Sequence, residues 1–200
     1  MDITRELSLY LNWLKGLLVK GDVQQVAHHL QEDKGNELII SQILDHIQLH
    51  PSEETVVLIA QAISKRKSQY REYLCYLDTY VEFMIWAICD FPITRFESLS
   101  TLCESLYKVC TQIPLSYVFD DTVTRIHRVL EEEEGGGARK VCGCILYLWY
   151  VRGGEIELSL DLVTHIKILS RTDPIQTQLT NQVLNTIQPQ HSLFNHFILL

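Results

Sequence analysis

Residues 69–91 read QYREYLCYLDTYVEFMIWAICDF, and their apolar side chains recur at helical spacing. One row of side chains steps by alternating fours and threes through Tyr70, Leu74, Leu77, Val81, Met84, Ile88 and Phe91. A second row lies beside the first, at Tyr73, Tyr76, Tyr80, Phe83 and Ala87. A surface helix needs only one apolar stripe, whereas two adjacent stripes require cover on two flanks. This stretch therefore predicts an inner helix of a layered helical array.

The same helical period runs along nearly all of the 200 residues, and no segment alternates cleanly at the strand period. The predicted helices cover 3–20, 23–31, 38–49, 53–65, 69–91, 95–111, a segment from 120 or 121 to about 130, 141–151, 158–169 and 174–187. Asp22, Ser52 and Asp173 are suited to be N-caps, and Pro174 to the first helical position. These signals predict an all-α fold of about ten helices, arranged as antiparallel pairs.

Paired helices begin near residues 22, 52, 95, 138 and 173, at spacings around the length typical of two-helix repeats. In periodicity and capping, most of the chain resembles the armadillo/HEAT class of α-solenoids. No repeat signature recurs residue by residue, although the corner at 171–174 is similar to a HEAT turn. The resemblance implies one irregular α-solenoid over residues 1–200, either complete or a fragment of a longer one. An ordinary non-repetitive helical bundle is the alternative fold.

Composition limits the classes of protein to which the chain can belong. It is 46% hydrophobic with a net charge of -8, and its six cysteines include no CxxC pair. A chain of this length can bury a core without disulfides or a metal, so we expect reduced, buried thiols. No secretory signal and no membrane-spanning apolar run is evident. We therefore expect a cytoplasmic or nuclear protein, for which broad binding to nucleic acid is disfavoured by the acidic charge.

Residues 131–137 read EEEEGGG and follow a predicted helix. Four acidic side chains at a helix C-terminus oppose the helix macrodipole. The three glycines add conformational freedom. The segment is therefore predicted to be a mobile acidic and glycine-rich loop within the array.

Two acidic side chains, Asp120 and Asp121, could hold Mg²⁺ with a diphosphate, as paired carboxylates do in some helical enzymes. Such a site needs a further acid one turn on, where Thr124 and Arg125 stand instead. Helix capping is the better explanation for this pair, because Asp is a favoured N-cap. A metal-dependent helical enzyme remains a remote alternative.

Histidines and cysteines also lack the partners that chemistry requires. His46 and His50 share a helical face, but zinc needs a third and usually a fourth donor. His165 continues an apolar row, so we expect it in the core. The Cys142-Gly143-Cys144 segment lies in an apolar helix, where the glycine would permit close approach of a neighbour. No phosphate loop, nucleophile elbow or metalloprotease motif is present, so the sequence predicts no enzyme, no cofactor and no small-molecule substrate.

Three groups of residues are candidates for binding. Trp86 falls on the polar side of the double-striped helix, and Tyr and Trp are enriched at recognition surfaces. The apolar tail resembles an uncapped solenoid end and contains Phe194, Phe197, Ile198, Leu199 and Leu200. A compact basic group consists of Lys65, Arg66 and Lys67.

We accordingly expect a non-enzymatic scaffold or adaptor subunit that binds other proteins through helical grooves, because solenoids offer extended surfaces for a peptide or helix. Its partners would be other protein subunits or a continuation of the same chain. The alternative is a nuclear scaffold that touches nucleic acid through the basic group, in chromosome or DNA-repair machinery.

Overall fold

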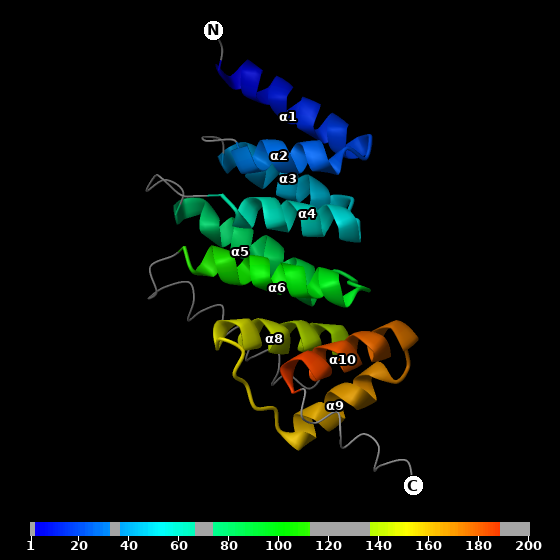
Figure 1. Ribbon diagram of the computed structural model, residues 1–200. Coiled ribbons are helices and arrows are strands. Elements are labelled where there is room, and N and C mark those ends of the chain that lie inside the picture. The colour runs from blue at the N-terminus through cyan, green and yellow to red at the C-terminus, as the bar shows by residue number, and fades with distance from the viewer. Residues whose placement is uncertain (1–2, 33–36, 67–73, 113–136, 189–200) are drawn as a thin grey trace.

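The computed structural model describes residues 3–32, 37–66, 74–112 and 137–188 (Figure 1). Its helices are α1 (Ile3–Val19), α2 (Val23–Glu32), α3 (Glu37–Leu49), α4 (Glu53–Ser64), α5 (Leu74–Cys89), α6 (Phe96–Cys110), α8 (Ala138–Val151), α9 (Leu160–Ser170) and α10 (Pro174–Ile187). No strand occurs in the described ranges. The prediction of an all-α fold is confirmed.

Helices two places apart in the chain lie side by side. Along one row, α2 contacts α4, α4 contacts α6, α6 contacts α8 and α8 contacts α10, while α1 contacts α3 and α3 contacts α5 in a second row. Figure 1 shows the helices stacked in one direction, with α1 at one end and α9 at the other. Helix α5 packs against α3, α4, α6 and α8, so the double-striped stretch does supply an inner helix.

The predicted N-caps are present at the helix starts. The side-chain oxygen of Ser52 accepts a hydrogen bond of 3.2 Å from the backbone N–H of Thr55 at the start of α4. At α10, the Asp173 carboxylate accepts one of 2.9 Å from the N–H of Ile175, and Pro174 occupies the first turn. Each cap satisfies a donor that a helix start leaves without an internal partner.

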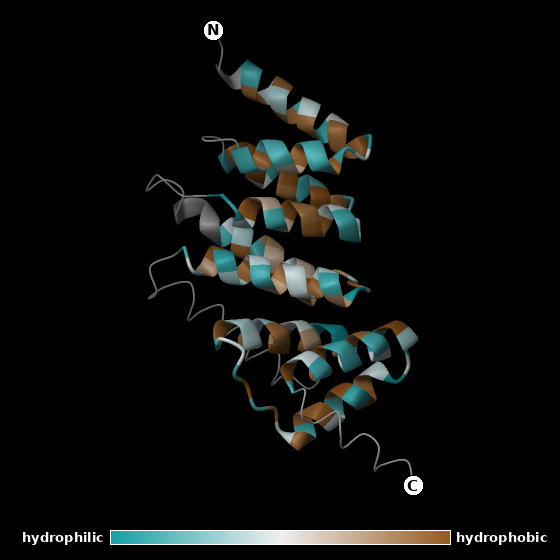
Figure 2. Cartoon of the chain, in the orientation of Figure 1, coloured by the Kyte–Doolittle hydropathy of each residue, from teal (hydrophilic) through white to brown (hydrophobic). Residues whose placement is uncertain are grey.

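One hydrophobic core runs along the array from α1 to α10. Among its largest fully buried side chains are Tyr80 and Phe83 of α5 and Tyr147 of α8. Figure 2 shows the opposite pattern at the surface, where the viewed face of α2 is largely hydrophilic. The helices therefore share a single core on their inner sides. Their outer sides face the solvent.

Gly143 lets α8 approach α5 and α6 closely. A Cβ atom added to this glycine would lie 2.4 Å from Cγ2 of Ile88 and 3.2 Å from Cδ1 of Leu99. Real Cβ atoms do not come so near a neighbour, so the position has no room for a side chain. The predicted close packing at Gly143 is confirmed.

A buried polar node joins four segments of the array, and it consists of Leu30, Glu37, Arg66 and Tyr80. The Arg66 guanidinium donates hydrogen bonds to the backbone carbonyl of Leu30 and, at 2.6 Å, to the Glu37 carboxylate. The Tyr80 hydroxyl donates to the other oxygen of the same carboxylate. The Leu30 carbonyl belongs to the last turn of α2, where helical carbonyls lack internal partners. The node therefore ends α2 and ties it to α3, α4 and α5.

A second polar link runs from α4 to the start of α6. The Glu53 carboxylate accepts hydrogen bonds from the backbone N–H groups of Thr94 at 3.1 Å and of Arg95 at 3.2 Å. Burial opposes ionisation of this carboxyl, but hydrogen bonds from Ser98, Thr94 and Arg95 outweigh burial and lower the pKa of Glu53. Arg95, the N-cap residue of α6, makes no capping bond with its own side chain. A residue of α4 thus performs the capping of α6.

Replacing Glu53 with glutamine is expected to lower the free energy of unfolding by about 1–2 kcal/mol at neutral pH, because charge-assisted hydrogen bonds are lost. A lowered folded-state pKa stabilises the fold above the unfolded-state pKa, and this contribution disappears as the pH falls through the folded-state value. The difference between the Glu53→Gln variant and the original protein should therefore shrink as the pH falls through the folded-state pKa, which lies below the usual value for Glu. Urea denaturation at neutral pH and at a series of acidic pH values measures it.

The neighbouring Glu54 is exposed and provides the control. The Glu54→Gln variant should change the stability by less than about 0.5 kcal/mol. Equal effects of the two substitutions would contradict the capping role of Glu53.

Three predictions fall outside the described residues. The paired acids Asp120 and Asp121, the acidic residues 131–134 and the apolar tail from Phe194 to Leu200 all lie there. Gly137, the last residue of the predicted loop, is described and occupies the N-cap position of α8. The expectations of a mobile loop and of an associating tail stay predictions.

Candidate functional site

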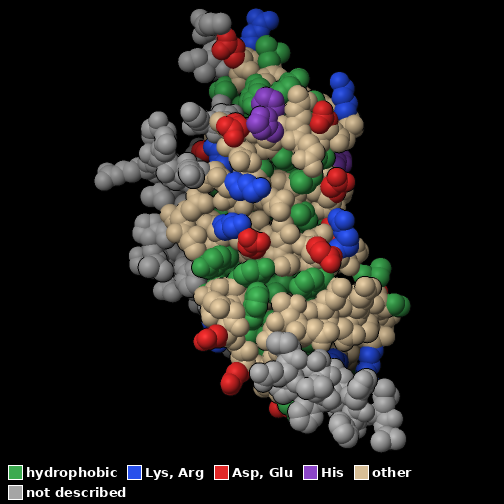
Figure 3. Space-filling view, in the orientation of Figure 1, with side chains coloured by type: hydrophobic (Ala, Val, Ile, Leu, Met, Phe, Trp, Pro, Cys, Tyr) green, Lys and Arg blue, Asp and Glu red, His purple; other side chains and the backbone are tan. Residues whose placement is uncertain are grey.

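Exposed and partly exposed rings gather where α1 meets α2. Trp13 is 42% exposed and stacks on Tyr10 with ring centroids 5.7 Å apart. The His29 ring of α2 meets the Trp13 ring edge-on, with centroids 4.8 Å apart. Leu9, one turn before Trp13, is 62% exposed. These four residues form what we call the α1 surface, and Figure 3 shows histidine beside hydrophobic side chains near this end of the viewed face.

The α1 surface was not predicted from the sequence, although the chain carries a signal for it. The apolar stripe of α1 faces inward through Leu14, which is fully buried. Leu9 and Trp13 are four residues apart and lie off that stripe, so they share a second helical face. Because α1 is the first described helix of the array, its main contacts are with α2 and α3.

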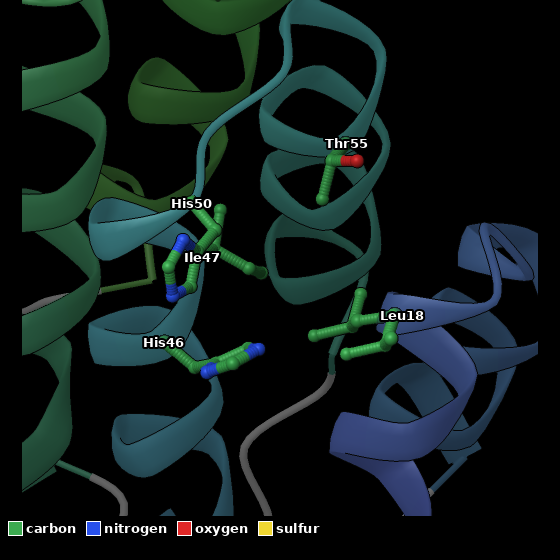
Figure 4. A pocket seen from close by; sticks show the side chains of 6 residues that line it. Leu18, His46, Ile47, His50 and Thr55 are labelled. Carbon is green, nitrogen blue, oxygen red and sulfur yellow. The ribbon is translucent and has the colours of Figure 1, made fainter.

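A small hollow of about 90 Å³ lies between the end of α1, the end of α3 and the start of α4. Its walls are made by Leu18, Val19, His46, Ile47, His50 and Thr55. Figure 4 shows the imidazoles of His46 and His50 one above the other on the side of α3 that faces the hollow. Burial, the charge of Lys15 and the neighbouring His50 lower the pKa of His46. The two imidazoles that share a helical face are thus brought together at one cavity.

Trp86 is half-buried in α5 and packs against the core. Its indole lies between two aromatic neighbours, with ring centroids 5.7 Å from Phe83 and 5.6 Å from Phe91. These aromatic neighbours cover part of the ring, so only part of the indole is exposed. Its role in protein binding stays a prediction.

The basic group does not form a continuous exposed ridge. Lys65 is exposed, but Arg66 is only 6% exposed and pairs with Glu37 in the buried polar node. Lys67 lies outside the described residues. Figure 3 shows basic and acidic side chains interspersed on the viewed face. Arg66 is therefore not available for the predicted contact with nucleic acid.

His165 is exposed, so its expected place in the core is wrong. Helix α9 turns Ile166 inward instead, and its contacts are mainly with α8 and α10. A helix at the end of an array buries a narrow stripe, and a shift of one residue moves a side chain by about 100° around the axis. The apolar row therefore predicted the helix but not which residues face inward.

In the part of the chain whose side chains the structure describes, five cysteines are buried free thiols, namely Cys89, Cys103, Cys110, Cys142 and Cys144. Burial raises the pKa of Cys142 to about 11 and that of Cys103 well above its usual range. The thiolate is the reactive form of cysteine, so these thiols are poor nucleophiles in the folded protein. Among the described residues, no group of three or more His, Cys, Asp or Glu side chains could hold a metal ion.

We expect these five thiols to remain unmodified when the folded protein is treated with iodoacetamide at neutral pH, and to react once the protein is unfolded in urea. Mass spectrometry of the peptides gives the extent of alkylation at each position. Rapid modification of Cys142 or Cys103 in the folded protein would contradict their burial. The prediction that these cysteines lie in the core is confirmed, because all five are buried.

Comparisons with protein-family models, with curated proteins and with solved structures were made for the whole chain. None of the three found a match. In the part of the chain that the structure describes, no helix is both long and apolar enough to cross a membrane. The function is therefore inferred from the described surfaces alone.

Proposed function

We propose that this protein is a non-enzymatic scaffold or adaptor subunit of the irregular α-solenoid type, similar in architecture to armadillo/HEAT arrays. The observation that carries the proposal is the packing of each helix on the helix two places along, from α2 to α10 and from α1 to α5. Stacked helix pairs contact mainly their neighbours and leave extended outer surfaces on which a peptide or helix can lie.

The α1 surface is the proposed protein-binding site. It combines Trp13 and Tyr10 with the exposed Leu9, and aromatic residues of this kind dominate the energetics of recognition surfaces. The surface lies at an end of the array, where another protein subunit, or a preceding part of a longer chain, can pack without displacing a helix. The proposed setting is the cytoplasm or the nucleus.

Protein partners are favoured over nucleic acid by the described charges. The chain has a net charge of -8, and Arg66 is held inside by Glu37. Backbone binding to nucleic acid requires several exposed cations that neutralise phosphates. The α1 surface instead offers rings and an aliphatic side chain, which suit a partly apolar protein surface.

Affinity purification with chemical cross-linking and mass spectrometry tests the proposal. The Trp13→Glu variant places a charge on the α1 surface, and the Leu160→Glu control places one at the opposite end, where Leu160 is 80% exposed. We expect a protein partner that the original and the control recover in similar amounts, cross-linked to residues near α1, and that the Trp13→Glu variant loses. Equal recovery by both variants, or cross-links confined to other helices, would contradict binding at the α1 surface.

A further inference from the structure

We propose that His46 and His50 form an open binding site for a divalent transition-metal ion, with Zn²⁺ as the reference ion, in the hollow between α1, α3 and α4. The two imidazoles supply two ligands, and water fills the remaining positions. This site is independent of the proposed protein-binding role, because it lies on a different face of α1.

The backbone fixes the two histidines one helical turn apart. The N–H of His50 donates a hydrogen bond of 3.2 Å to the carbonyl of His46, which continues the α-helical pattern to the end of α3. Side chains four residues apart on a helix are neighbours, and paired histidines at this spacing are the helical part of the H-E-x-x-H zinc motif. Ile47 stands where that motif has its glutamate, so the site would bind an ion without the motif's catalytic base.

The ring positions fit a shared ion. The imidazole centroids are 5.4 Å apart, with their planes inclined at 62°. A Zn–N bond of about 2.0–2.1 Å and tetrahedral geometry place the centroids of two bound imidazoles about 5 Å apart. Neither imidazole makes a hydrogen bond to any other described residue. The separation of the two rings is therefore close to that of two imidazoles bound to one ion.

Electrostatics act on the site in both directions. The positive charge of Lys15 is felt at His46 and opposes a cation there. The C-terminal end of α3, which the ion would adjoin, carries a partial negative charge from its unpaired carbonyls and favours a cation. We therefore expect the site to bind the ion with modest affinity. The Lys15 charge should weaken this binding, whereas it would have no such effect on an ion bound at a surface histidine elsewhere.

Isothermal titration of the purified, metal-free protein with ZnCl₂ tests the proposal. One ion should bind per chain, with a rise in the melting temperature that follows the Zn²⁺ concentration. His46→Gln and His50→Gln should each weaken the binding at least about tenfold, since each removes a ligand. Lys15→Gln should tighten it several-fold because a repulsive charge is removed.

His28→Gln is the matched control. His28 lies in α2 beside His29 and does not line the hollow, so this variant should bind Zn²⁺ there as the original protein does. Circular dichroism of each variant establishes that it folds. Failure to observe saturable binding of one ion, or binding that both His46→Gln and His50→Gln retain, would overturn the proposal.

Discussion

Replacing Arg66 with alanine is expected to lower the free energy of unfolding by about 3–5 kcal/mol, because the largely covered Glu37 carboxylate loses its cationic partner. The same substitution leaves the Leu30 carbonyl without the donor that ends α2. Both groups lie where water does not replace the lost hydrogen bonds fully, so the cost includes their desolvation. Equilibrium denaturation in urea measures the change.

Lys65 precedes Arg66 in the chain and is exposed, which makes Lys65→Ala the matched control. That substitution removes the same unit of charge but no buried contact, so the stability should change by less than about 0.5 kcal/mol. If Arg66→Ala lowered the free energy of unfolding by as little, the guanidinium would lie in solvent. The basic group would then again be a candidate for contact with nucleic acid.

Placing valine at Gly143 is expected to destabilise the protein by about 2–3 kcal/mol or to displace α8. The first added carbon would collide with Ile88, whose Cγ2 atom is attached near the backbone and cannot swing away freely. Overpacking of a dense core costs this much because neighbouring side chains must leave their preferred rotamers. Thermal and urea denaturation measure the loss.

Gly16 in α1 offers the opposite case within the same protein. Nothing lies within 4 Å of a Cβ atom placed there, and the residue lies inside a helix. Gly16→Ala should therefore stabilise the protein by about 0.5–1 kcal/mol through helix propensity. If both glycine substitutions were stabilising, the close approach of α8 to α5 would be refuted.

The sequence predicted the helices well where local chemistry determines them. Ser52 and Asp173 mark the starts of α4 and α10 because their side chains hydrogen-bond within the next few residues. The predicted bounds of α1 to α4 differ from the observed ones by at most one residue. The inner position of α5 followed from its two stripes, since a helix with two apolar flanks has to be covered on both.

Features that depend on contacts between distant residues were not predictable in the same way. Arg66 is an exposed basic residue by local pattern, and only the approach of Glu37, 29 positions earlier, draws it inside. Trp86 is partly covered because Phe83 and Phe91 fold around it. Hydrophobic periodicity gives the direction of a stripe, but the ring partners of a side chain depend on the tertiary packing.

The link from Glu53 to the start of α6 has a counterpart at the other end of the same helix pair. The side-chain amide of Gln112, just beyond α6, donates a hydrogen bond of 3.2 Å to the Ser64 carbonyl at the end of α4. Each of these helices is therefore completed at a terminus by the other. If one of them unfolds, the other loses a terminal hydrogen-bond partner, so the pair should open as one cooperative unit in hydrogen exchange, with closely similar opening free energies for both helices.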